Sequence, residues 1–411
     1  MTSILIHHIR ELVGLRPTPA GPLRGAALGE LSTISDAFLL IEGDRIAAFG
    51  PMSEAPPRAD LSIDANGQLL FPAWVDSHTH LVFAGSREGE FEDRIRGLSY
   101  EEIAARGGGI LNSAARLQDT PEEELVEQAL NRLQEVIGYG TGAIEIKSGY
   151  GLTVAAELKM LRVIRRLKEL SPLPIRATFL GAHAVPKAFR DLREGYLRLV
   201  IDEMLPRIAG EGLADYIDVF CEKIAFSPAE MDRILEAGQR YGLRPKVHVN
   251  QFFSLGGIPT AVARNALSVD HLEVVGGADM EVLRDSPTIA TLLPSAPFFL
   301  NDHYPPARQL IDNDIAVALA TDFNPGSTPS GRMPFVLSLA CIKMRMSPAE
   351  AVNAATINGA FALELEADYG SIAVGKKANL FLTKPIPSVG YLPYAFGSDL
   401  VETVVLNGEV V

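Results

Sequence analysis

Residues 71–80 of this 411-residue chain, FPAWVDSHTH, place two histidines directly after a short apolar stretch. The apolar stretch over 71–77 predicts a buried β-strand, and eight such stretches alternate with amphipathic helical segments along the chain. Repeated strand-then-helix units build a parallel sheet, which is either open and doubly wound or closed into a barrel. An open sheet usually carries a glycine-rich turn after its first strand, but here His78 and His80 follow that strand. The sequence therefore favours a barrel.

The other predicted strands support a closed barrel of eight units. They are expected at 142–147, 175–182, 215–221, 245–249, 267–272, 288–294 and 315–321. Three intervening helices have start signals in which a hydroxyl caps the helix, a proline follows and a carboxylate can reach back, beginning at Thr120, Ser227 and Ser347. The predicted fold class is therefore α/β, a (β/α)8 TIM-like barrel.

The two ends of the chain predict β structure. Residues 38–49 are two apolar stretches around a Gly-Asp turn, and residues 403–411 repeat this design around Asn-Gly, a strong hairpin signal. We therefore expect a small composite β-sandwich domain formed by 1–70 and 373–411, with the barrel over 71–372.

The charge balance limits the classes of partner. The chain has 37 Lys and Arg against 51 Asp and Glu, a formal charge of −14, and no Lys/Arg-rich run. This composition argues against nucleic-acid or anionic-membrane partners, so an anionic substrate would need a local cation. No apolar run of about 18 residues and no secretion signal is seen, which predicts a cytoplasmic protein. Cys221 and Cys341 form no CxxC pair and are expected to be reduced and structural.

Histidines and one aspartate gather at the predicted carboxyl ends of the strands, where barrel enzymes keep their active sites. His78 and His80 point to the same side of a strand, about 7 Å apart. The other members of this group are His183, His248, His271 and Asp322. The adjacent His7 and His8 would face opposite ways on a strand and are expected at the surface. His303 lies in a Pro-rich loop after the seventh strand, where it is expected to be solvated or, alternatively, to belong to a lid.

His78, His80, His248 and Asp322 are predicted to hold one divalent metal ion. Three imidazoles and a carboxylate suit Zn²⁺ or Fe²⁺ and leave room for a water whose pKa the metal lowers towards about 7. Asp322 could also accept the proton of that water and deliver it later to a leaving nitrogen.

Five stretches carry a resemblance to a known family. The His-x-His strand, the later strand-end histidines and the final aspartate resemble the amidohydrolase superfamily. Within it, the chain closely resembles the imidazolonepropionases, through VDSHTHLVFAGSREGEF (75–91), SYEEIAARGGGI (99–110), EIKSGYGL (145–152), LGAHAVP (180–186) and TDFNPGS (321–327). The terminal hairpins match the small β domain of that family, so the resemblance covers nearly the whole chain.

The resemblance implies hydrolysis of the lactam ring of 4-imidazolone-5-propanoate to N-formimidoyl-L-glutamate in histidine degradation, by attack of metal-bound hydroxide on the ring carbonyl. It assigns the metal to the four ligands above. It places the substrate contacts on Arg87, Tyr150, His183, Gln251, Asn324, Gly326 and Ser327, to which we add Tyr100 as a further candidate.

Each placement also has a chemical reason. Arg87 would grip the propionate carboxylate as a planar cation, and glycines beside Tyr150 would let its phenol project into the site. The turn at 324–327 would offer accessible backbone N–H groups. His183 and His271 would act in catalysis by stabilising the oxyanion, and His271 could assist Asp322 in proton transfer.

Three other functions and a homodimer are also compatible with the sequence. A ring deaminase of the same superfamily generally carries a glutamate where this chain has Gln251, and an amide cannot act as acid or base. A binuclear site would need a carbamylated lysine, for which Lys147 is the candidate, although we expect it to pair with a carboxylate instead. A metal-storing barrel without activity would not need Asp322 and Arg87 together. Barrels of this type often pair, which leaves a homodimer open.

Overall fold

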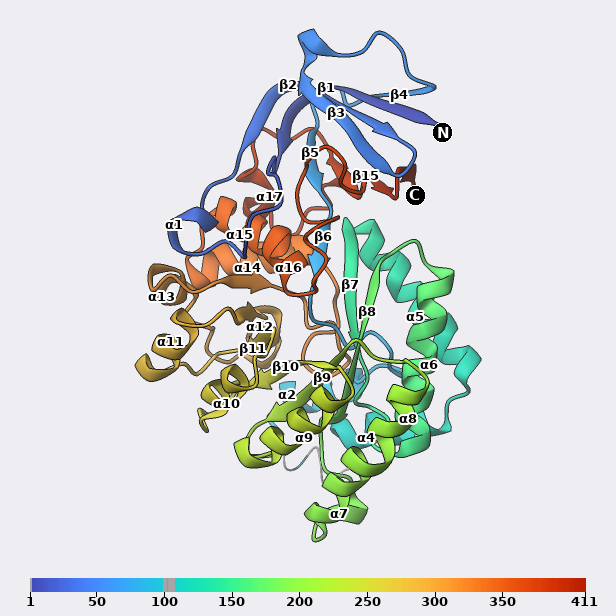
Figure 1. Ribbon diagram of the computed structural model, residues 1–411, viewed down its shortest axis with the longest axis vertical. Helices are drawn as coiled ribbons and strands as arrows, with labels where there is room; N and C mark the ends of the chain where they lie inside the picture. Colours follow the sequence, from blue (N-terminus) through green and yellow to red (C-terminus); the bar gives the residue numbers. More distant parts are fainter. Residues whose placement is uncertain (1, 99–101, 103–107) are drawn as a thin grey trace.

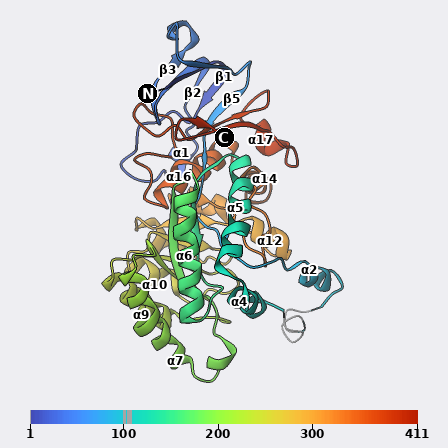
Figure 2. The same ribbon diagram turned by 90° about the vertical axis from the view of Figure 1, so that its right-hand side faces the viewer.

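The computed structural model describes residues 2–98, 102 and 108–411 (Figure 1). Tyr100, one of the predicted substrate contacts, lies outside these residues. The described chain forms a parallel barrel and a separate mixed sheet built from both chain ends. Figure 2 shows this sheet at one end of the molecule and helix α7 (Arg193–Arg198) at the other.

The barrel consists of eight parallel strands paired in chain order, as predicted. They are β6 (Trp74–Asp76), β7 (Thr141–Lys147), β8 (Ile175–Ala182), β9 (Tyr216–Cys221), β10 (Arg244–Val249), β11 (Ser268–His271), β12 (Ile289–Leu292) and β13 (Val317–Leu319). The first and last strands meet just beyond their carboxyl ends. There the Asp322 N–H donates to the His78 carbonyl at 3.0 Å and the His80 N–H donates to the Phe323 carbonyl at 2.9 Å. The (β/α)8 prediction is confirmed.

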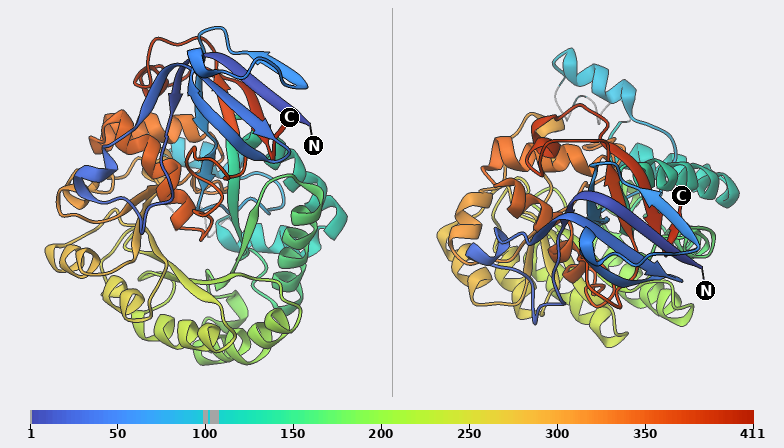
Figure 3. Two further views of the ribbon diagram at one scale, coloured as in Figure 1. Left: turned by 45° about the horizontal axis from the view of Figure 1, so that its top comes forward. Right: turned by 90° about the horizontal axis from the view of Figure 1, so that it is seen from above.

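Helices surround the barrel (Figure 3, left). In chain order the α-helices besides α7 are α1 (Gly25–Leu28), α2 (Glu88–Ile95), α4 (Ile110–Asp119), α5 (Glu122–Gly138), α6 (Val154–Leu170), α8 (Leu205–Gly210), α9 (Pro228–Arg240), α10 (Gly257–Ala263), α11 (Gly277–Arg284), α12 (Ser295–Leu300), α13 (Ala307–Asp312), α14 (Met333–Met344), α15 (Pro348–Ala355), α16 (Ile357–Phe361) and α17 (Tyr391–Tyr394). Short 3₁₀ turns cover Met52–Glu54 and Lys187–Phe189, and a π-helical segment covers Leu199–Met204. Within the described ranges, none of these helices is both long and apolar enough to span a bilayer.

Two of the three predicted helix starts are confirmed. Ser227 and Ser347 each form a complete capping box with the glutamate three residues later, at the start of α9 and α15. Thr120 does not cap α5. Its hydroxyl donates to the Arg116 carbonyl at 2.7 Å instead, because it lies at the end of α4 and closes that helix.

The small sheet joins the two chain ends. Its strands are β1 (Ser3–Val13), β2 (Thr33–Glu42), β3 (Arg45–Pro51), β4 (Leu61–Asp64), β5 (Leu69–Pro72), β14 (Leu380–Thr383), β15 (Val401–Leu406) and β16 (Glu409–Val410). Both predicted hairpins are present, as β2–β3 and β15–β16. The N- and C-terminal parts are continuous, because β5 and β14 pair antiparallel. The strands share a core of their own, which includes Ile6, Leu39 and Leu380.

The single strand predicted over 71–77 is divided between the two sheets. The Ala73 N–H donates to the Asn379 carbonyl in the small sheet, and the next N–H, of Trp74, donates to the Gly140 carbonyl beside the barrel, both at 2.9 Å. The prediction was wrong because Phe71 and Trp74 are both buried, so the apolar run does not reveal where the chain changes partners. The exchange fixes the start of β6, and with it the position of the two histidines that follow.

His7 and His8 do not face opposite ways. The register of β1 against β2 shifts between Ile6 and Ile9, and His8 has a φ of 53°. This bulge brings the two rings together, with centroids 4.5 Å apart, and His8 Nδ1 lies 3.0 Å from Asp64 Oδ1. The strict alternation assumed from the sequence does not hold across a bulge.

Candidate active site

The carboxyl ends of the barrel strands open into a cavity of ≈ 1220 Å³. It collects side chains from segments far apart in the sequence, and nearly all described residues predicted for the site line it. These are His80, Arg87, Tyr150, His183, His248, Gln251, His271, Asp322, Asn324, Gly326 and Ser327. His78 lies beneath them and is fully buried. The structure therefore brings together the predicted metal ligands and those predicted substrate contacts that lie in the described residues.

The side chains of the four predicted metal ligands converge. Nε2 of His80 lies 3.1 Å from Nε2 of His248, and Asp322 Oδ1 lies 3.6 Å from Nε2 of both His78 and His80. Ligands about 2.1 Å from a tetrahedral ion lie about 3.4 Å from one another, so this spacing fits one ion. His78 Nε2 is buried without a hydrogen-bond partner, as expected of an atom that binds a metal.

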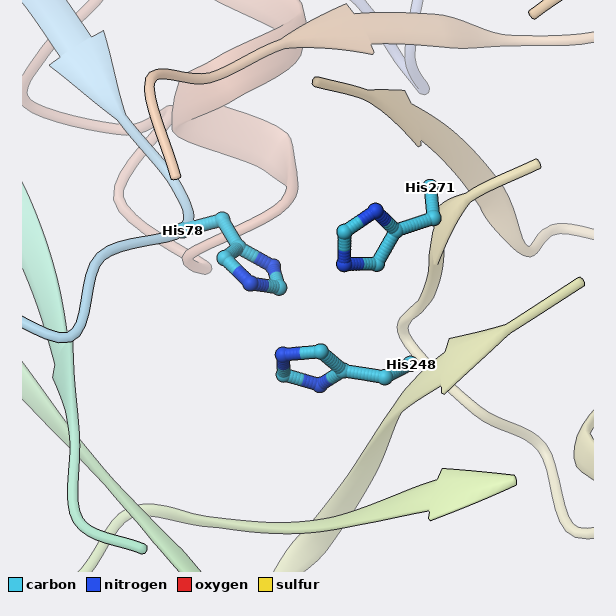
Figure 4. Close-up of side chains that lie close together, drawn as sticks. All are labelled: His78, His248 and His271. Carbon is cyan, nitrogen blue, oxygen red and sulfur yellow. The ribbon is translucent and has the colours of Figure 1, made fainter. Parts of the chain in front are cut away.

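His271 lies beside this group. The rings of His78, His248 and His271 face a common space (Figure 4), and one nitrogen from each lies within 4.8 Å of the others. Although burial opposes it, the Glu273 carboxylate raises the pKa of His271, whose Nδ1 lies 3.4 Å from Glu273 Oε1. His271 also has a φ of 88°, a strained conformation for a residue other than glycine. A protonated His271 can donate a hydrogen bond from Nε2.

Carboxylates behind the site orient two of the imidazoles. Asp270 Oδ2 lies 2.6 Å from His78 Nδ1, and Asp218 Oδ2 lies 2.8 Å from His248 Nδ1. A carboxylate can only accept, so Nδ1 carries the hydrogen and Nε2 presents its lone pair. Burial lowers the pKa of both rings well below the usual range, which keeps them neutral. Both rings are thus in the form that binds a metal.

Asp322 is buried at the centre of the group. Burial raises the pKa of its carboxyl to about 7, against the opposing effect of the nearby His271 charge. Its Oδ1 faces the imidazoles, and its Oδ2 accepts the Ser327 hydroxyl at 3.3 Å. A carboxyl with this pKa can take up and release a proton at neutral pH.

The hydrogen bonding of His183 does not fit the oxyanion donor predicted from the sequence. Burial lowers its pKa to about 4, and its Nδ1–H donates to the Gly149 carbonyl at 3.1 Å. Its Nε2 is therefore an acceptor and cannot donate to an oxyanion. The contact depends on Gly149, which has a φ of +111° and whose Cβ would lie 2.9 Å from His183 Nδ1. Tyr150 follows directly, and its ring centroid lies 5.5 Å from that of His183.

Arg87 lines the cavity but is not free. Its Nε and Nη2 donate to Glu90 Oε2 at 2.9 and 2.5 Å, and Glu90 Oε1 accepts the Gly109 N–H at 2.9 Å. Nη1 lies against the backbone of Gly326, where a Cβ would collide with it. Glu90 thus holds the Nε and Nη2 edge of the guanidinium, and Nη1 occupies the space that the missing side chain of Gly326 leaves.

The turn over 324–327 corrects the prediction of accessible N–H groups. Asn324 Oδ1 accepts both the Gly326 N–H at 2.7 Å and the Ser327 N–H at 2.8 Å, and the Asn324 N–H donates to the Thr328 carbonyl. Asn324 Nδ2 donates to the Asp322 carbonyl at 2.7 Å. The side chain of Asn324 satisfies the turn internally, so the turn supports Asp322 instead of offering backbone donors to a ligand.

Lys147 pairs with carboxylates, as expected. Its Nζ lies 2.8 Å from Glu145 Oε1, 2.9 Å from Asp218 Oδ2 and 3.7 Å from Asp270 Oδ2, with no exposed surface. Burial opposes charge here, but the three carboxylates raise the pKa of Lys147 above its ordinary value. Carbamylation requires a neutral amine, so this lysine is unsuited to bridging two ions.

Sequence reasoning missed the residues that support the site. Asp218 interrupts the apolar strand YIDVFC, Asp270 and Glu273 flank His271, and Glu90 lies within the SREGEF stretch. An acidic residue in an otherwise apolar strand is a usable signal, since a buried carboxylate needs a partner. Which histidine or arginine it contacts depends on neighbouring strands and loops, and no local pattern carries that information.

Comparisons with known proteins give a consistent result. A model of the amidohydrolase family matches residues 69–411. The imidazolonepropionase of Christiangramia forsetii is 56% identical over 410 residues, covering 100% of both chains. That of Flavobacterium johnsoniae is 56% identical over 408 residues, covering 99% of both.

Solved structures share the fold. Escherichia coli guanine deaminase superposes with a TM-score of 0.75 at 17% identity, covering 100% of this chain and 99% of that one. A triazine hydrolase from Arthrobacter aurescens also gives a TM-score of 0.75 at 17% identity, covering 100% and 94%. At this identity the likeness concerns architecture alone.

Proposed function

The chain belongs to the amidohydrolase family and, within it, to the imidazolonepropionases, and on this premise we propose that it opens the lactam ring of 4-imidazolone-5-propanoate to give N-formimidoyl-L-glutamate in histidine degradation. The observation that carries the proposal is one cavity lined by His80, His248, Asp322 and the guanidinium of Arg87, with the fully buried His78 grouped with His80 and Asp322. The cluster suits hydrolysis of an amide, and the guanidinium suits a substrate with a carboxylate.

Arg87 binds the propionate group. Glu90 occupies its Nε and Nη2, so Nη1 is the donor left for the substrate carboxylate. Tyr150 and Gln251 also line the cavity and orient the ring, and His183 Nε2 accepts a ring N–H. Asn324, Gly326 and Ser327 close the cavity beside Arg87 and hold Asp322 in place.

His78, His80, His248 and Asp322 would hold one divalent ion, zinc or iron. Such an ion polarises a carbonyl and lowers the pKa of a bound water towards about 7, which makes a nucleophile available at neutral pH. The neutral imidazoles and the spacing of the four ligand atoms support this assignment.

Asp322 transfers protons. Its carboxyl takes the proton of the attacking water on one oxygen and delivers it to the ring nitrogen as the C–N bond breaks. The Glu273 carboxylate raises the pKa of His271, and in its protonated form His271 donates a hydrogen bond to the oxygen that becomes negative during attack. Gln251 takes no part in proton transfer, because an amide does not ionise at neutral pH.

Ring deamination is the competing function. It is disfavoured because Gln251 lacks the ionisable group expected there in deaminases, and because the 56% identity is to imidazolonepropionases, whereas the guanine deaminase is 17% identical. Metal analysis of the purified protein, combined with an ultraviolet assay on freshly made 4-imidazolone-5-propanoate, tests site and substrate together. Ring opening with about one ion per chain supports the proposal. Ammonia release from guanine or cytosine, without ring opening of the imidazolone, refutes it.

We also propose the predicted division into a small domain, 1–70 with 373–411, and a barrel domain, 71–372, with the first boundary moved past Pro72 because Phe71 and Pro72 pair with β14 in the small sheet. Limited proteolysis would test these boundaries.

The cytoplasmic location and the homodimer stay predictions. Sedimentation analysis of the purified protein would test the homodimer.

A further inference from the structure

We propose that Lys147 is a positioning residue for the metal centre: its ammonium, placed between Asp218 and Asp270, holds both carboxylates in the orientation that directs His248 and His78 towards the ion. The inference rests on the proposed metal site. Lys147 itself touches neither the ligands nor the cavity, so it acts through its two partners.

Two series of contacts lead from Lys147 Nζ through a carboxylate to an imidazole. Lys147 Nζ lies 2.9 Å from Asp218 Oδ2, and the same oxygen lies 2.8 Å from His248 Nδ1. Nζ also lies 3.7 Å from Asp270 Oδ2, which lies 2.6 Å from His78 Nδ1. Each imidazole is thus connected to Lys147 through one carboxylate oxygen. The three strands involved, β7, β9 and β11, are not neighbours, so the lysine links elements that the backbone ladder does not join directly.

Charge explains why a cation is needed at this point. Asp218 and Asp270 are both buried, with their charged oxygens directed at the same nitrogen. Two carboxylates this close repel each other strongly away from water, and burying them without a cation is costly. Without Lys147 the carboxylates would turn apart or recruit other partners, and the Nδ1 contacts that orient the imidazoles would weaken.

Lys246 provides a matched comparison. It is equally buried on the neighbouring strand β10 and belongs to the same charge cluster, with Nζ 3.3 Å from Glu145 Oε2 and 3.0 Å from the Ala362 carbonyl. The structure gives it no contact with Asp218 or Asp270 among the described residues. Removing its charge tests the general cost of losing a buried lysine without disturbing the carboxylates behind the ligands.

The experiment measures metal affinity on the full-length protein. Apo-protein of wild type, Lys147→Met and Lys246→Met is titrated with Zn²⁺ against a chromophoric chelator, and Co²⁺-loaded samples are compared by visible absorption. We expect Lys147→Met to weaken Zn²⁺ binding by about 10- to 100-fold, the usual effect of disturbing groups behind metal ligands. Its Co²⁺ spectrum should also change. Lys246→Met should keep wild-type affinity and spectrum.

The zinc affinities of the three proteins either support or overturn the role of Lys147. Equal affinities for wild type and Lys147→Met, or equal losses in both lysine variants, would overturn the inference while leaving the metal site intact. A wild-type protein that binds no divalent ion would refute the metal site, and the inference with it. If Lys147→Met does not fold, Lys147→Gln replaces it. If neither folds while Lys246→Met does, Lys147 serves barrel stability and the proposal is overturned.

Discussion

Asp218 holds His248 at two points. Its Oδ1 accepts the backbone N–H of His248 at 3.0 Å, and its Oδ2 lies 2.8 Å from Nδ1 of the ring. The two residues lie on adjacent strands, β9 and β10, so the carboxylate fixes both the backbone position and the ring orientation. The imidazole is therefore oriented before any ion arrives, which reduces the cost of assembling the site.

Replacing Asp218 by Asn should weaken metal binding by about 10- to 100-fold. The amide keeps the shape of the side chain, but its nitrogen cannot accept the Nδ1–H of His248. Chelator competition on the apo-protein measures the effect. Asp285→Asn is the control, since the side chain of Asp285 is 73% exposed and does not line the cavity. Equal affinity in Asp218→Asn and wild type would show that the carboxylate does not prepare the ligand.

Replacing Asp322 by Asn should lower kcat by about 10²- to 10⁴-fold, the range that general acid–base groups contribute. Asparagine can still face a metal through its oxygen, but it cannot carry the proton. Turnover is measured on imidazolone propionate and divided by the metal content of each sample. Substantial turnover per bound ion in this variant would refute the proton-transfer role.

Replacing Arg87 by Met should raise KM by about 10- to 100-fold with little change in kcat, because a hydrogen bond to a charged group contributes about 1.5–3 kcal/mol. Methionine keeps much of the apolar stem and removes the donors. Arg96→Met is the control, since Arg96 lies at the end of the same helix and its side chain is 66% exposed. An unchanged KM would exclude contact between Arg87 and the propionate.

Replacing Gly326 by Ala should raise KM by about tenfold, since a displacement of about 1 Å in a binding group can cost up to about 100-fold. The added Cβ would meet Nη1 of Arg87 and push the guanidinium away from the cavity. Gly277→Ala is the matched control, because nothing lies within 4 Å of its Cβ position. The idea fails if both variants bind substrate as wild type does.

The two cysteines should resist thiol reagents in the native protein. Burial raises the pKa of the Cys221 thiol to about 12 and that of Cys341 to about 11. Only the thiolate reacts, and its fraction grows as pH rises towards the pKa, so native labelling at pH 8 should be slow and should increase above pH 10. Unfolding in guanidinium should release both thiols. Rapid stoichiometric labelling of Cys221 at pH 8 would contradict its burial.

Local sequence signals predicted the barrel strands well because each signal spans one strand. The alternation of apolar stretches with helices locates seven of the eight strands to within a few residues. It failed at 71–77, where one apolar run serves two sheets, and at Thr120, where a hydroxyl between two helices closes the first one. In both places the same local pattern is compatible with two sets of partners, and contacts from distant segments select one.

The strand-end histidines, with Asp322, were visible in the sequence because strand order and strand direction alone bring them to one rim. The cavity that they share with Arg87 and Tyr150 follows from the same topology. The partners of these site residues could not be predicted from the sequence. Side-chain packing between segments up to 192 residues apart decides whether Asp270 faces His78 and whether Glu90 contacts Arg87. It also decides whether the Asn324 side chain accepts the N–H groups of its own turn.

The amino-acid order by itself thus determined the architecture, the group of ligand-type side chains and their approximate meeting point, since these depend on periodicity and on residue type. Tertiary structure alone decided the protonation and orientation of each group. His183 became an acceptor because burial keeps its ring neutral and its Nδ1–H donates to the Gly149 carbonyl, whereas the Glu273 carboxylate, against the effect of burial, favours the donating form of His271. Such effects depend on distances of about 3 Å in a water-poor interior, and these exist only once the chain has folded.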